Sequence, residues 1–253
     1  MRTIRKLTVH QLTFMPRLFP VNAYIVEEDD SLTIVDAALP YSVRGIVRAA
    51  EAIGKPVARI VLTHAHGDHI GALDALKAAL PHAAVCISAR DARLLAGDRT
   101  LDAGEPQTPV RGDVPKAGKV KTKPDVLLRD GDRIGSLLAV ATPGHTPGHL
   151  SFFDTRNGAL IAGDAFQTRG GLAVSGHLRP AFPFPAMATW SKEEAVASAR
   201  KLLELQPTLL ACGHGRMLDR PADAVGRAIR EAAAVLKPTG GRGGQERYAS
   251  HRA

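Results

Sequence analysis

The chain has 253 residues and a formal net charge of +8, with 45% hydrophobic and 23% charged residues, which suits one large or two small globular domains. No run of about 18 apolar residues occurs, which excludes a membrane-spanning helix, and the basic N-terminus lacks the apolar segment of a signal peptide. Two cysteines cannot form a disulfide framework, so we expect a cytoplasmic protein with reduced cysteines. We expect its positive charge to be dispersed over an arginine-rich surface.

The N-terminal part of the chain has the composition and the turn signals of β-strands. We predict strands over Ile4–Leu12, Asn22–Glu27 and Leu32–Val35, the last two joined as a hairpin. The segment Phe14–Pro20 contains two prolines, which prevent a regular central strand. Its aromatic and methionine side chains fit either a pocket wall or a loop anchor.

Helices then alternate with strands. Apolar residues recur at helical spacing from Val43 to Ile53, and Gly54 follows as a C-cap. The next predicted elements are a strand over Ile60–Leu62, a helix from about Gly71 to Leu80, a strand over Ala84–Ile87 and a helix starting near Ser88. This alternation indicates an α/β or mixed layered domain rather than an all-β sandwich.

The second half again changes from strands to helices. Strand-like runs cover Val126–Leu128, Ser136–Ala141, Leu150–Phe153, Leu160–Ala162 and Leu209–Cys212. Ser191 and Glu194 form a capping box that begins a helix ending near Leu205, and a last helix precedes Lys237. We predict one domain over residues 1–236 and a flexible tail at 237–253, which has four basic residues against one acidic residue.

Two stretches, residues 97–124 and 167–190, show no periodicity of either kind. Loops of this length inside a domain are usually functional or disordered. The second stretch contains Phe182, Phe184 and Trp190, which fit an apolar pocket wall or the core equally well. No motif assigns a role to either stretch.

Four metal-capable side chains lie within six residues, in the sequence His64-Ala65-His66-Gly67-Asp68-His69. They directly follow an apolar run, so we place them in a loop at the end of a central strand. Imidazole and carboxylate are the usual protein ligands of zinc, with iron and manganese as rivals.

Three further candidate ligands, His145, Asp164 and His214, also stand in loops just after apolar strands. Each has a glycine immediately before it, which lets the backbone come close without a Cβ clash. Strand ends in one sheet lie side by side, so these loops can converge on one point. His149 follows His145 by four residues, and we expect it to support a ligand rather than bind a metal ion.

The seven candidate ligands together resemble the signature of the metallo-β-lactamase superfamily of metallohydrolases. The resemblance covers residues 23–222 and includes Asp36, which looks like the aspartate that braces the metal loop in this family. It implies an α+β fold, a four-layer αββα sandwich with a dinuclear metal site at one edge of the paired sheets.

The resemblance also implies a role for each ligand. A first metal ion would be bound by His64, His66 and His145, and a second by Asp68, His69 and His214, with Asp164 bridging both. The cofactors would be two divalent ions, in the first place Zn²⁺, with iron or manganese as alternatives. A metal-bridging hydroxide would attack the carbonyl of a small-molecule ester, thioester or lactone, and Asp68 would orient the nucleophile or pass a proton to the leaving group.

Departures from individual branches of the family narrow the expected activity. True β-lactamases generally lack an aspartate at the place of Asp164, and flavodiiron members usually have glutamate where His66 stands, so antibiotic hydrolysis and oxygen reduction are disfavoured. Glyoxalase II has a helical C-terminal substrate domain, whereas one helix and a glycine-rich tail follow His214. The segment Thr142–Ser151 still looks like glyoxalase II and the related lactonases and thioesterases.

Two other activities stay open. A phosphodiesterase or nuclease could use the same site, and a basic cluster favours it: Arg111, Lys116, Lys119, Lys121 and Lys123. No nucleic-acid module or aromatic-rich basic surface is present, so we do not expect a nucleic-acid partner. A mononuclear iron dioxygenase acting on a thiol or persulfide is the other alternative, and metal content separates it. His177 is a candidate substrate contact, and the apolar loops are compatible with a homodimer.

Overall fold

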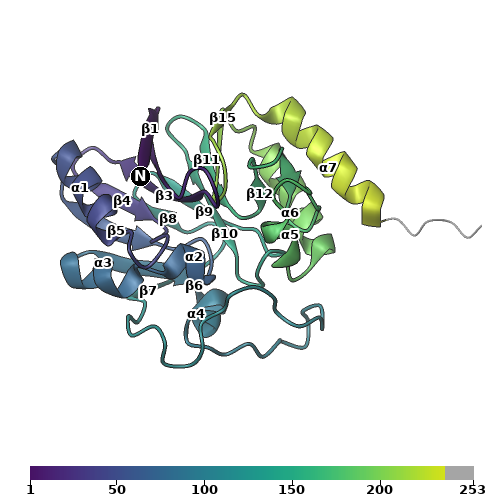
Figure 1. Ribbon diagram of the computed structural model, residues 1–253, viewed down its shortest axis with the longest axis horizontal. Coiled ribbons are helices and arrows are strands. Elements are labelled where there is room, and N and C mark those ends of the chain that lie inside the picture. Colours follow the sequence, from purple (N-terminus) through teal and green to yellow (C-terminus); the bar gives the residue numbers. More distant parts are fainter. Residues whose placement is uncertain (237–253) are drawn as a thin grey trace, which may run out of the picture.

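Two β-sheets pack face to face, and helices cover the outer face of each, so the chain forms four layers in the order αββα (Figure 1). This arrangement confirms the predicted α+β sandwich. The computed structural model describes residues 1–236, and the predicted tail lies outside them. Within these 236 residues, no helix is both long and apolar enough to cross a membrane.

The first sheet is built from the N-terminal half of the chain, purple to teal in Figure 1. Its strands lie in chain order: β1 (Arg2–Lys6), β2 (Val9–Phe14), β3 (Val21–Glu27), β4 (Leu32–Val35), β5 (Val57–Val61), β6 (Ala84–Ser88) and β7 (Val126–Leu128). Neighbours from β4 to β7 are parallel, and parallel strands need a crossover connection. The crossovers carry helices α1 (Val43–Ile53), α2 (Gly67–Ile70), α3 (Leu73–Ala79) and α4 (Ala89–Leu95).

The second sheet has the strand order β15-β14-β11-β10-β9-β8. Its strands are β8 (Arg133–Ile134), β9 (Leu137–Ala141), β10 (Leu150–Asp154), β11 (Ala159–Gly163), β14 (Leu209–Cys212) and β15 (Leu218–Asp219). The parallel pair, β11 and β14, is connected through β12 (Phe166–Gln167), β13 (Ala173–Val174), α5 (Phe184–Met187) and α6 (Lys192–Glu204). Helix α6 and the last helix, α7 (Ala222–Leu236), cover the outer face of this sheet.

Strand β3 illustrates how both faces of the first sheet are buried. Ala23 and Ile25 face the helices of the first half, whereas Tyr24 and Val26 face the second sheet. Successive side chains of a strand point to opposite faces, so a strand covered on both sides is mostly apolar, as β3 is from Ala23 to Val26. The four layers therefore enclose three apolar clusters, one between the sheets and one under the helices of each half.

The structure corrects the predicted strand over Ile4–Leu12. Two strands, β1 and β2, pair there across a turn at Leu7 and Thr8, and Leu7 has a φ angle of +54°. Tight hairpin turns usually contain glycine or asparagine, and this turn contains neither, so its composition does not reveal it. Strands β8, β12, β13 and β15 were also not predicted, because two residues are too few to show alternation.

Helix ends follow the predicted capping residues with two differences. Gly54 caps α1 with a φ angle of +81°, as predicted. The helix predicted from about Gly71 starts at Leu73 as α3, and a separate single turn that was not predicted, α2, precedes it. The side chain of Ser191 accepts the N–H of Glu194, which is one half of the predicted capping box. The backbone N–H of Ser191 donates to the carbonyl of Gly144 instead of to the Glu194 side chain, and this bond fastens α6 to the loop after β9.

Replacing Phe152 by alanine tests the core between the sheets. Phe152 on β10 is fully buried there, so Phe152→Ala should lower the free energy of unfolding by about 3–5 kcal/mol through lost apolar burial and the cavity that remains. Chemical unfolding followed by circular dichroism measures the change. Val126→Ala, at a side chain that is 43% exposed, should change it by about 0.5 kcal/mol or less, and equal effects would contradict this packing.

Candidate metal centre

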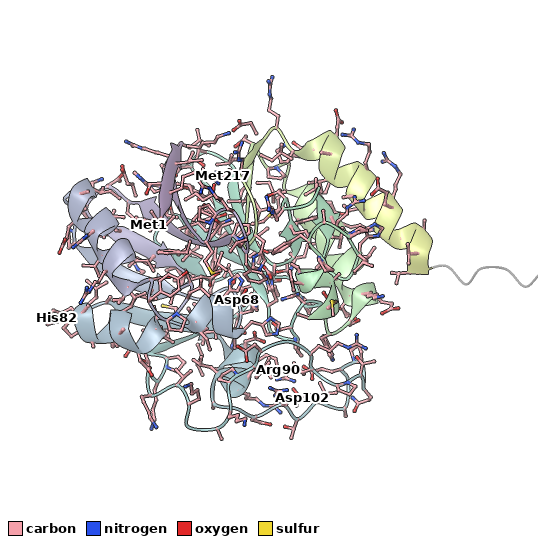
Figure 2. All side chains as sticks on the ribbon, viewed as in Figure 1. Met1, Asp68, His82, Arg90, Asp102 and Met217 are labelled. Atoms are coloured by element: carbon pink, nitrogen blue, oxygen red, sulfur yellow. The ribbon has the colours of Figure 1, made fainter. Side chains whose placement is uncertain are left out.

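The histidine-rich motif begins just after β5, at the edge of the first sheet. Helix α2 is a single turn with His66 as its N-cap, and it carries Asp68 and His69. The imidazoles of His64, His66 and His69 are buried, whereas the side chain of Asp68 keeps 24% of its surface exposed. The loop therefore directs three imidazoles inward and leaves one carboxylate partly open to solvent, near the middle of the molecule in Figure 2.

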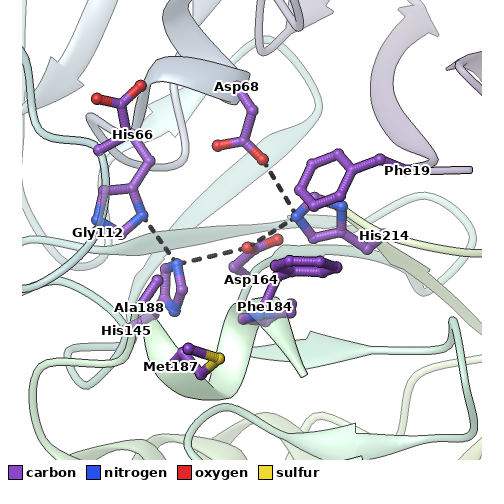
Figure 3. A pocket seen from close by; sticks show the side chains of 12 residues that line it. Phe19, His66, Asp68, Gly112, His145, Asp164, Phe184, Met187, Ala188 and His214 are labelled. Carbon is purple, nitrogen blue, oxygen red and sulfur yellow. Dashed lines mark hydrogen bonds and ion pairs between the residues drawn. The ribbon is translucent and has the colours of Figure 1, made fainter. Parts of the chain in front are cut away.

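The other three predicted ligands reach the same point from the second sheet. His145 follows β9, Asp164 follows β11 and His214 follows β14. Asp164 Oδ2 lies 3.4 Å from Nε2 of His145 and 3.2 Å from Nε2 of His214. Asp164 Oδ1 lies 3.4 Å from Nε2 of His69. Figure 3 shows Asp164 between His145 and His214, with Asp68 turned toward the same point.

All seven predicted ligands fall into groups whose ligand atoms lie within 4.8 Å of one another. The first ligand group is His64, His66 and His145, and the second ligand group is Asp68, His69 and His214. A further group, of His64, His69 and Asp164, joins these two. The structure thus brings together all seven residues that the sequence predicted as metal ligands.

Each imidazole has one nitrogen held by an oxygen atom and the other directed into the centre. The held contacts are His64 Nδ1 to Thr63 Oγ1 (3.0 Å), His66 Nε2 to Arg111 O (2.9 Å), His69 Nδ1 to Asp36 Oδ2 (2.8 Å), His145 Nδ1 to Ser175 Oγ (2.9 Å) and His214 Nδ1 to Pro20 O (2.8 Å). An oxygen acceptor keeps a proton on the held nitrogen, so the ring in its neutral form presents the lone pair of its other nitrogen to the centre. Metal-binding histidines are oriented in this way.

Several buried atoms at this point have no hydrogen-bond partner within the described part of the chain: His64 Nε2, His69 Nε2 and Asp164 Oδ1. In addition, His66 Nδ1 and His145 Nε2 lie 2.9 Å apart with their lone pairs facing each other. Leaving buried polar atoms unpaired costs free energy. A divalent cation satisfies them together, because neutral imidazole and carboxylate are its usual donors, so the residues fit a metal site.

Asp36 and His149 support the ligands from behind. Asp36 accepts hydrogen bonds from the N–H and the hydroxyl of Thr63, both at 2.8 Å, and from Nδ1 of His69. It therefore braces the metal loop, as the resemblance implied. His149 Nε2 accepts the N–H of Asp164 at 3.1 Å, and burial lowers the pKa of His149 to about 3, so this imidazole stays neutral.

The loop of His214 is held by two side chains of the N-terminal strands that the sequence did not single out. Asn22 on β3 donates from Nδ2 to the carbonyls of Cys212 (2.8 Å) and Gly215 (2.9 Å). Gln11 on β2 donates from Nε2 to the same carbonyl of Gly215 at 2.6 Å. Their only signal in the sequence was a polar residue inside a buried strand.

The first irregular stretch, residues 97–124, holds His66 in place. The carbonyl of Arg111 accepts a hydrogen bond from its Nε2, and Gly112 lies against the ring with a φ angle of +82°. A Cβ atom on Gly112 would stand 2.4 Å from His66 Nε2. Only glycine therefore fits at this position, for both its conformation and its size.

Ion pairs fasten this stretch to α4. Arg90 Nε lies 2.6 Å from Glu105 Oε1, and Arg93 Nη1 lies 2.8 Å from Asp102 Oδ1. Figure 2 shows Arg90 and Asp102 close together in the lower part of the molecule, where the stretch runs below α4. These contacts have no sequence period, which is why the pattern of apolar residues assigned no role to the stretch.

The second irregular stretch reaches another ligand, His145. The hydroxyl of Ser175, which contacts His145 Nδ1, lies 2.8 Å from the hydroxyl of Thr189. Thr189 in turn donates to the carbonyl of Pro185 in α5 at 2.7 Å. A chain of hydrogen bonds therefore connects the imidazole to the helix that forms one wall of the cavity.

A cavity of about 400 Å³ opens over the two ligand groups (Figure 3). Its floor consists of His66, Asp68, His145, Asp164 and His214. Its apolar wall consists of Phe19, Phe184, Pro185, Met187 and Ala188. Two segments supply this wall: the proline-containing segment Phe14–Pro20, and helix α5 of the second irregular stretch. For Phe19 and Phe184, the structure therefore selects the pocket wall over the alternative roles of loop anchor and core residue.

Three other candidate pocket residues lie elsewhere. Phe182 is buried with its ring centroid 5.2 Å from that of His214, and Trp190 is a core residue whose Nε1 donates to the carbonyl of Thr108. His177 lines a separate hollow beside α7, so it does not border the cavity over the ligand groups. A loop residue's direction depends on contacts that are distant in sequence, and composition does not reveal it.

Burial and charge divide the histidines into two kinds. Burial lowers the pKa of all three imidazoles of the first ligand group, so they are neutral near pH 7. Burial acts in the same direction on His69 and His214, but the charge of Asp164 and other carboxylates outweighs it and raises their pKa, to about 10 for His214. Without a cation, the second ligand group holds protons that metal binding displaces.

A sequence profile described as the metallo-beta-lactamase superfamily matches residues 16–214. The chain belongs to this superfamily. It is 57% identical to the uncharacterized protein YobT of Bacillus subtilis (strain 168), over 92% of this chain and 99% of that protein. It is 31% identical to the probable metallo-hydrolase YflN of the same organism, over 77% of this chain and 80% of that protein. Membership of the metallo-beta-lactamase superfamily implies divalent metal ions at the centre described above.

Other proteins similar to this chain carry the name of a reaction or a metal. The hydroxyacylglutathione hydrolase of Rhodospirillum rubrum is 29% identical over 67% of this chain, which spans only 52% of that enzyme. The structure of TTHA1623 in a di-iron-bound form is 27% identical, with a TM-score of 0.60 over 85% of this chain and 96% of that one. The BLEG-1 B3 metallo-beta-lactamase is 22% identical, with a TM-score of 0.61 over 90% and 100% of the two chains, and shares the fold.

Two glycines of the first irregular stretch provide a matched test of the contact with His66. Gly112 and Gly118 have φ angles of +82° and +71°, but a Cβ on Gly118 would meet no neighbour within 4 Å. Gly112→Ala should displace His66 and weaken zinc binding by about 10- to 100-fold. Gly118→Ala should cost only backbone strain of about 1–2 kcal/mol. Zinc titration against a competing chelator measures the affinities, and equal values for the two variants would contradict the contact's role.

The raised pKa values of His69 and His214 predict how the metal-free protein responds to pH. A histidine whose folded pKa exceeds its unfolded value of about 6.5 stabilises the fold below that pH, and the contribution disappears as pH rises through the folded pKa. The melting temperature of chelator-treated protein should therefore fall between about pH 6.5 and about pH 10. His214→Gln should show a smaller fall over the same range; the same fall as in the wild type would refute this assignment.

Proposed function

We propose that this protein is a dinuclear metal-dependent hydrolase that cleaves the ester, thioester or lactone bond of a small acyl substrate. The position of Asp164 is the observation that carries the proposal. One carboxylate oxygen faces His145 and His214, and the other faces His69, so the side chain joins the two ligand groups. A carboxylate in this position can bridge two ions, and paired ions about 3.5–4 Å apart are typical of hydrolytic centres.

Zinc is the metal ion that suits this donor set best. The ligands are imidazole nitrogens and carboxylate oxygens, which zinc binds in catalytic sites with a position left for water or substrate. Iron is the main rival, because the same donors suit it and the related TTHA1623 has a di-iron-bound form. The proposal requires two ions of either metal, and manganese is the third candidate.

When bound, two such ions polarise a substrate carbonyl and lower the pKa of a water molecule toward neutrality. Asp68 is the residue suited to move the proton, because its side chain is partly exposed and lies on the cavity floor, with Oδ2 3.4 Å from Nε2 of His214. In the metal-free protein, burial opposes its ionisation, but the charges of His69 and His214 outweigh burial and lower its pKa. Bound cations would take over this effect once metal binding has displaced the histidine protons. An ionised Asp68 can orient the nucleophile and carry its proton to the leaving group.

The apolar wall of the cavity supports a substrate with an apolar acyl group. The rings of Phe19 and Phe184 meet edge to face with centroids 5.0 Å apart. Phe184 and Met187 keep 50% and 64% of their surface exposed beside a polar floor. Apolar walls with a few convergent polar groups are typical of small-molecule sites, and about 400 Å³ suits a small substrate.

The basic residues of the first irregular stretch lie away from the cavity over the metal centre, and this location favours a carbonyl compound over a phosphodiester as the substrate. Lys116 and Lys119 border a different hollow beside α2, together with Asp74 and Arg99. Arg111 contributes its carbonyl oxygen, not its guanidinium group, to the contact with the ligand of the first group. Among residues 1–236, no lysine or arginine lines the cavity over the metal centre to bind a phosphate chain.

Metal content and a substrate panel test the proposal together. Protein purified without chelator should hold two zinc or iron ions per chain and should hydrolyse a lactone, thioester or ester faster than a phosphodiester. One iron ion per chain, no hydrolysis and oxygen consumption with a persulfide would instead identify a dioxygenase.

Asp68→Asn tests the role of the partly exposed carboxylate. Because an amide cannot take up the proton, the variant should lower kcat by about 10²–10⁴-fold with little change in melting temperature. Metal analysis of the same sample shows how much of the loss comes from an incomplete second ligand group. Asp29→Asn, on an exposed turn, is the control and should keep full activity. Unchanged turnover in Asp68→Asn would rule out this mechanism.

A further inference from the structure

Asp91 is a fully buried carboxylate that joins the two loops of the first ligand group. It lies in the first turn of α4, where the hydroxyl of Ser88 accepts its N–H at 2.9 Å. Its Oδ2 accepts hydrogen bonds from the N–H of Ala65 (3.0 Å) and the hydroxyl of Thr146 (2.8 Å). Its Oδ1 accepts the N–H of Gly148 at 2.8 Å. All of its acceptor bonds therefore go to the loops after β5 and β9.

These bonds act on the segments that carry the imidazoles. Ala65 stands between His64 and His66 in the loop from the first sheet, and Thr146 follows His145 in the loop from the second sheet. The core between the two sheets is apolar, and apolar contact has no directional preference. Hydrogen bonds add a directional constraint on the spacing of the three ligands, and Asp91 binds both loops at once.

Burying an ionised carboxylate at this position costs free energy. The partners of Asp91 are a hydroxyl and two backbone N–H groups, none of them a cation, while the neighbouring Arg90 pairs with Glu105. Burial raises the pKa of Asp91 to about 6, so near pH 7 it is ionised in surroundings that disfavour charge. An apolar side chain would serve packing at lower cost. A carboxylate is the group that accepts N–H donors from two directions.

We propose that Asp91 is a positioning residue for the first ligand group. By fixing the distance between the loop of His64 and His66 and the loop of His145, it determines how tightly this group binds a metal ion. The inference rests on the metal site of the proposed function but not on its substrate. Asparagine cannot replace Asp91, because its amide nitrogen would face a backbone N–H on one side and leave that donor unpaired.

The test compares Asp91→Asn with Asp74→Asn, a control of the same chemistry. Asp74 on α3 accepts the N–H groups of Lys121 and Thr122 and the hydroxyl of Thr122, away from the ligand loops. Zinc titration against a competing chelator gives the affinity for each of the two ions. Unfolding by denaturant is measured with and without zinc, which shows whether a loss of stability depends on the metal.

In Asp91→Asn, one of the two zinc ions should bind about 10- to 100-fold more weakly, and the loss of stability should be larger with zinc than without it. Asp74→Asn should lose the same stability in both forms and keep the wild-type zinc affinity. Wild-type affinity in Asp91→Asn, with equal losses of stability in both forms, would mean a purely structural role and would overturn the inference.

A second variant decides the matter if Asp91→Asn does not fold. Thr146→Val removes one of the three hydrogen bonds and keeps the carboxylate, so weaker zinc binding supports the inference and wild-type binding overturns it. A wild-type chain that binds none of zinc, iron and manganese overturns both the inference and the proposed function. A wild-type chain that binds two ions without hydrolysing the panel contradicts only the proposed substrate, and the zinc affinities still decide the role of Asp91.

Discussion

Five imidazoles and two carboxylates converge at the edge where the two sheets meet, and several of their atoms are buried without a hydrogen-bond partner in the described residues. Such atoms are costly unless a cation lies among them. Much of the structure around the centre can be understood as a frame for this arrangement. One nitrogen of each ring is held by an oxygen atom, which leaves the other nitrogen free to bind a metal ion.

The frame is assembled from both halves of the chain, so folding and metal binding are linked. The carbonyl of Pro20 and the side chain of Asn22, from the first half, hold the loop of His214 in the second. Asp91 accepts hydrogen bonds from loops of both sheets. Apolar contact between the sheets has no directional preference, so these hydrogen bonds add the constraint that orients the ligand loops.

The candidate metal ligands and the apolar wall of the cavity occupy different parts of the fold. The ligands stand at strand ends, which the sheets hold rigidly, whereas the wall of the cavity comes from irregular segments around Phe19 and Phe184. Because the wall comes from other segments than the ligands, wall residues can change without disturbing the ligands. The contacts from Ser175 through Thr189 to α5 are where the wall and a ligand meet.

The sequence by itself indicated a mixed layered domain and the ligand candidates, because both depend on local patterns: apolar runs that mark strands, and glycine followed by histidine or aspartate at their ends. The four-layer αββα order was implied by the family resemblance of those candidates. It missed the turn at Leu7, where no glycine or asparagine marks the reversal. It also missed Asp91, Asn22 and the carbonyl of Arg111, whose partners stand 26 to 193 residues away in the chain. Only the tertiary structure decided those roles, because a hydrogen bond between distant segments has no period and no spacing in the sequence. The cavity wall was decided in the same way, since the direction of a loop side chain depends on what the folded chain places beside it.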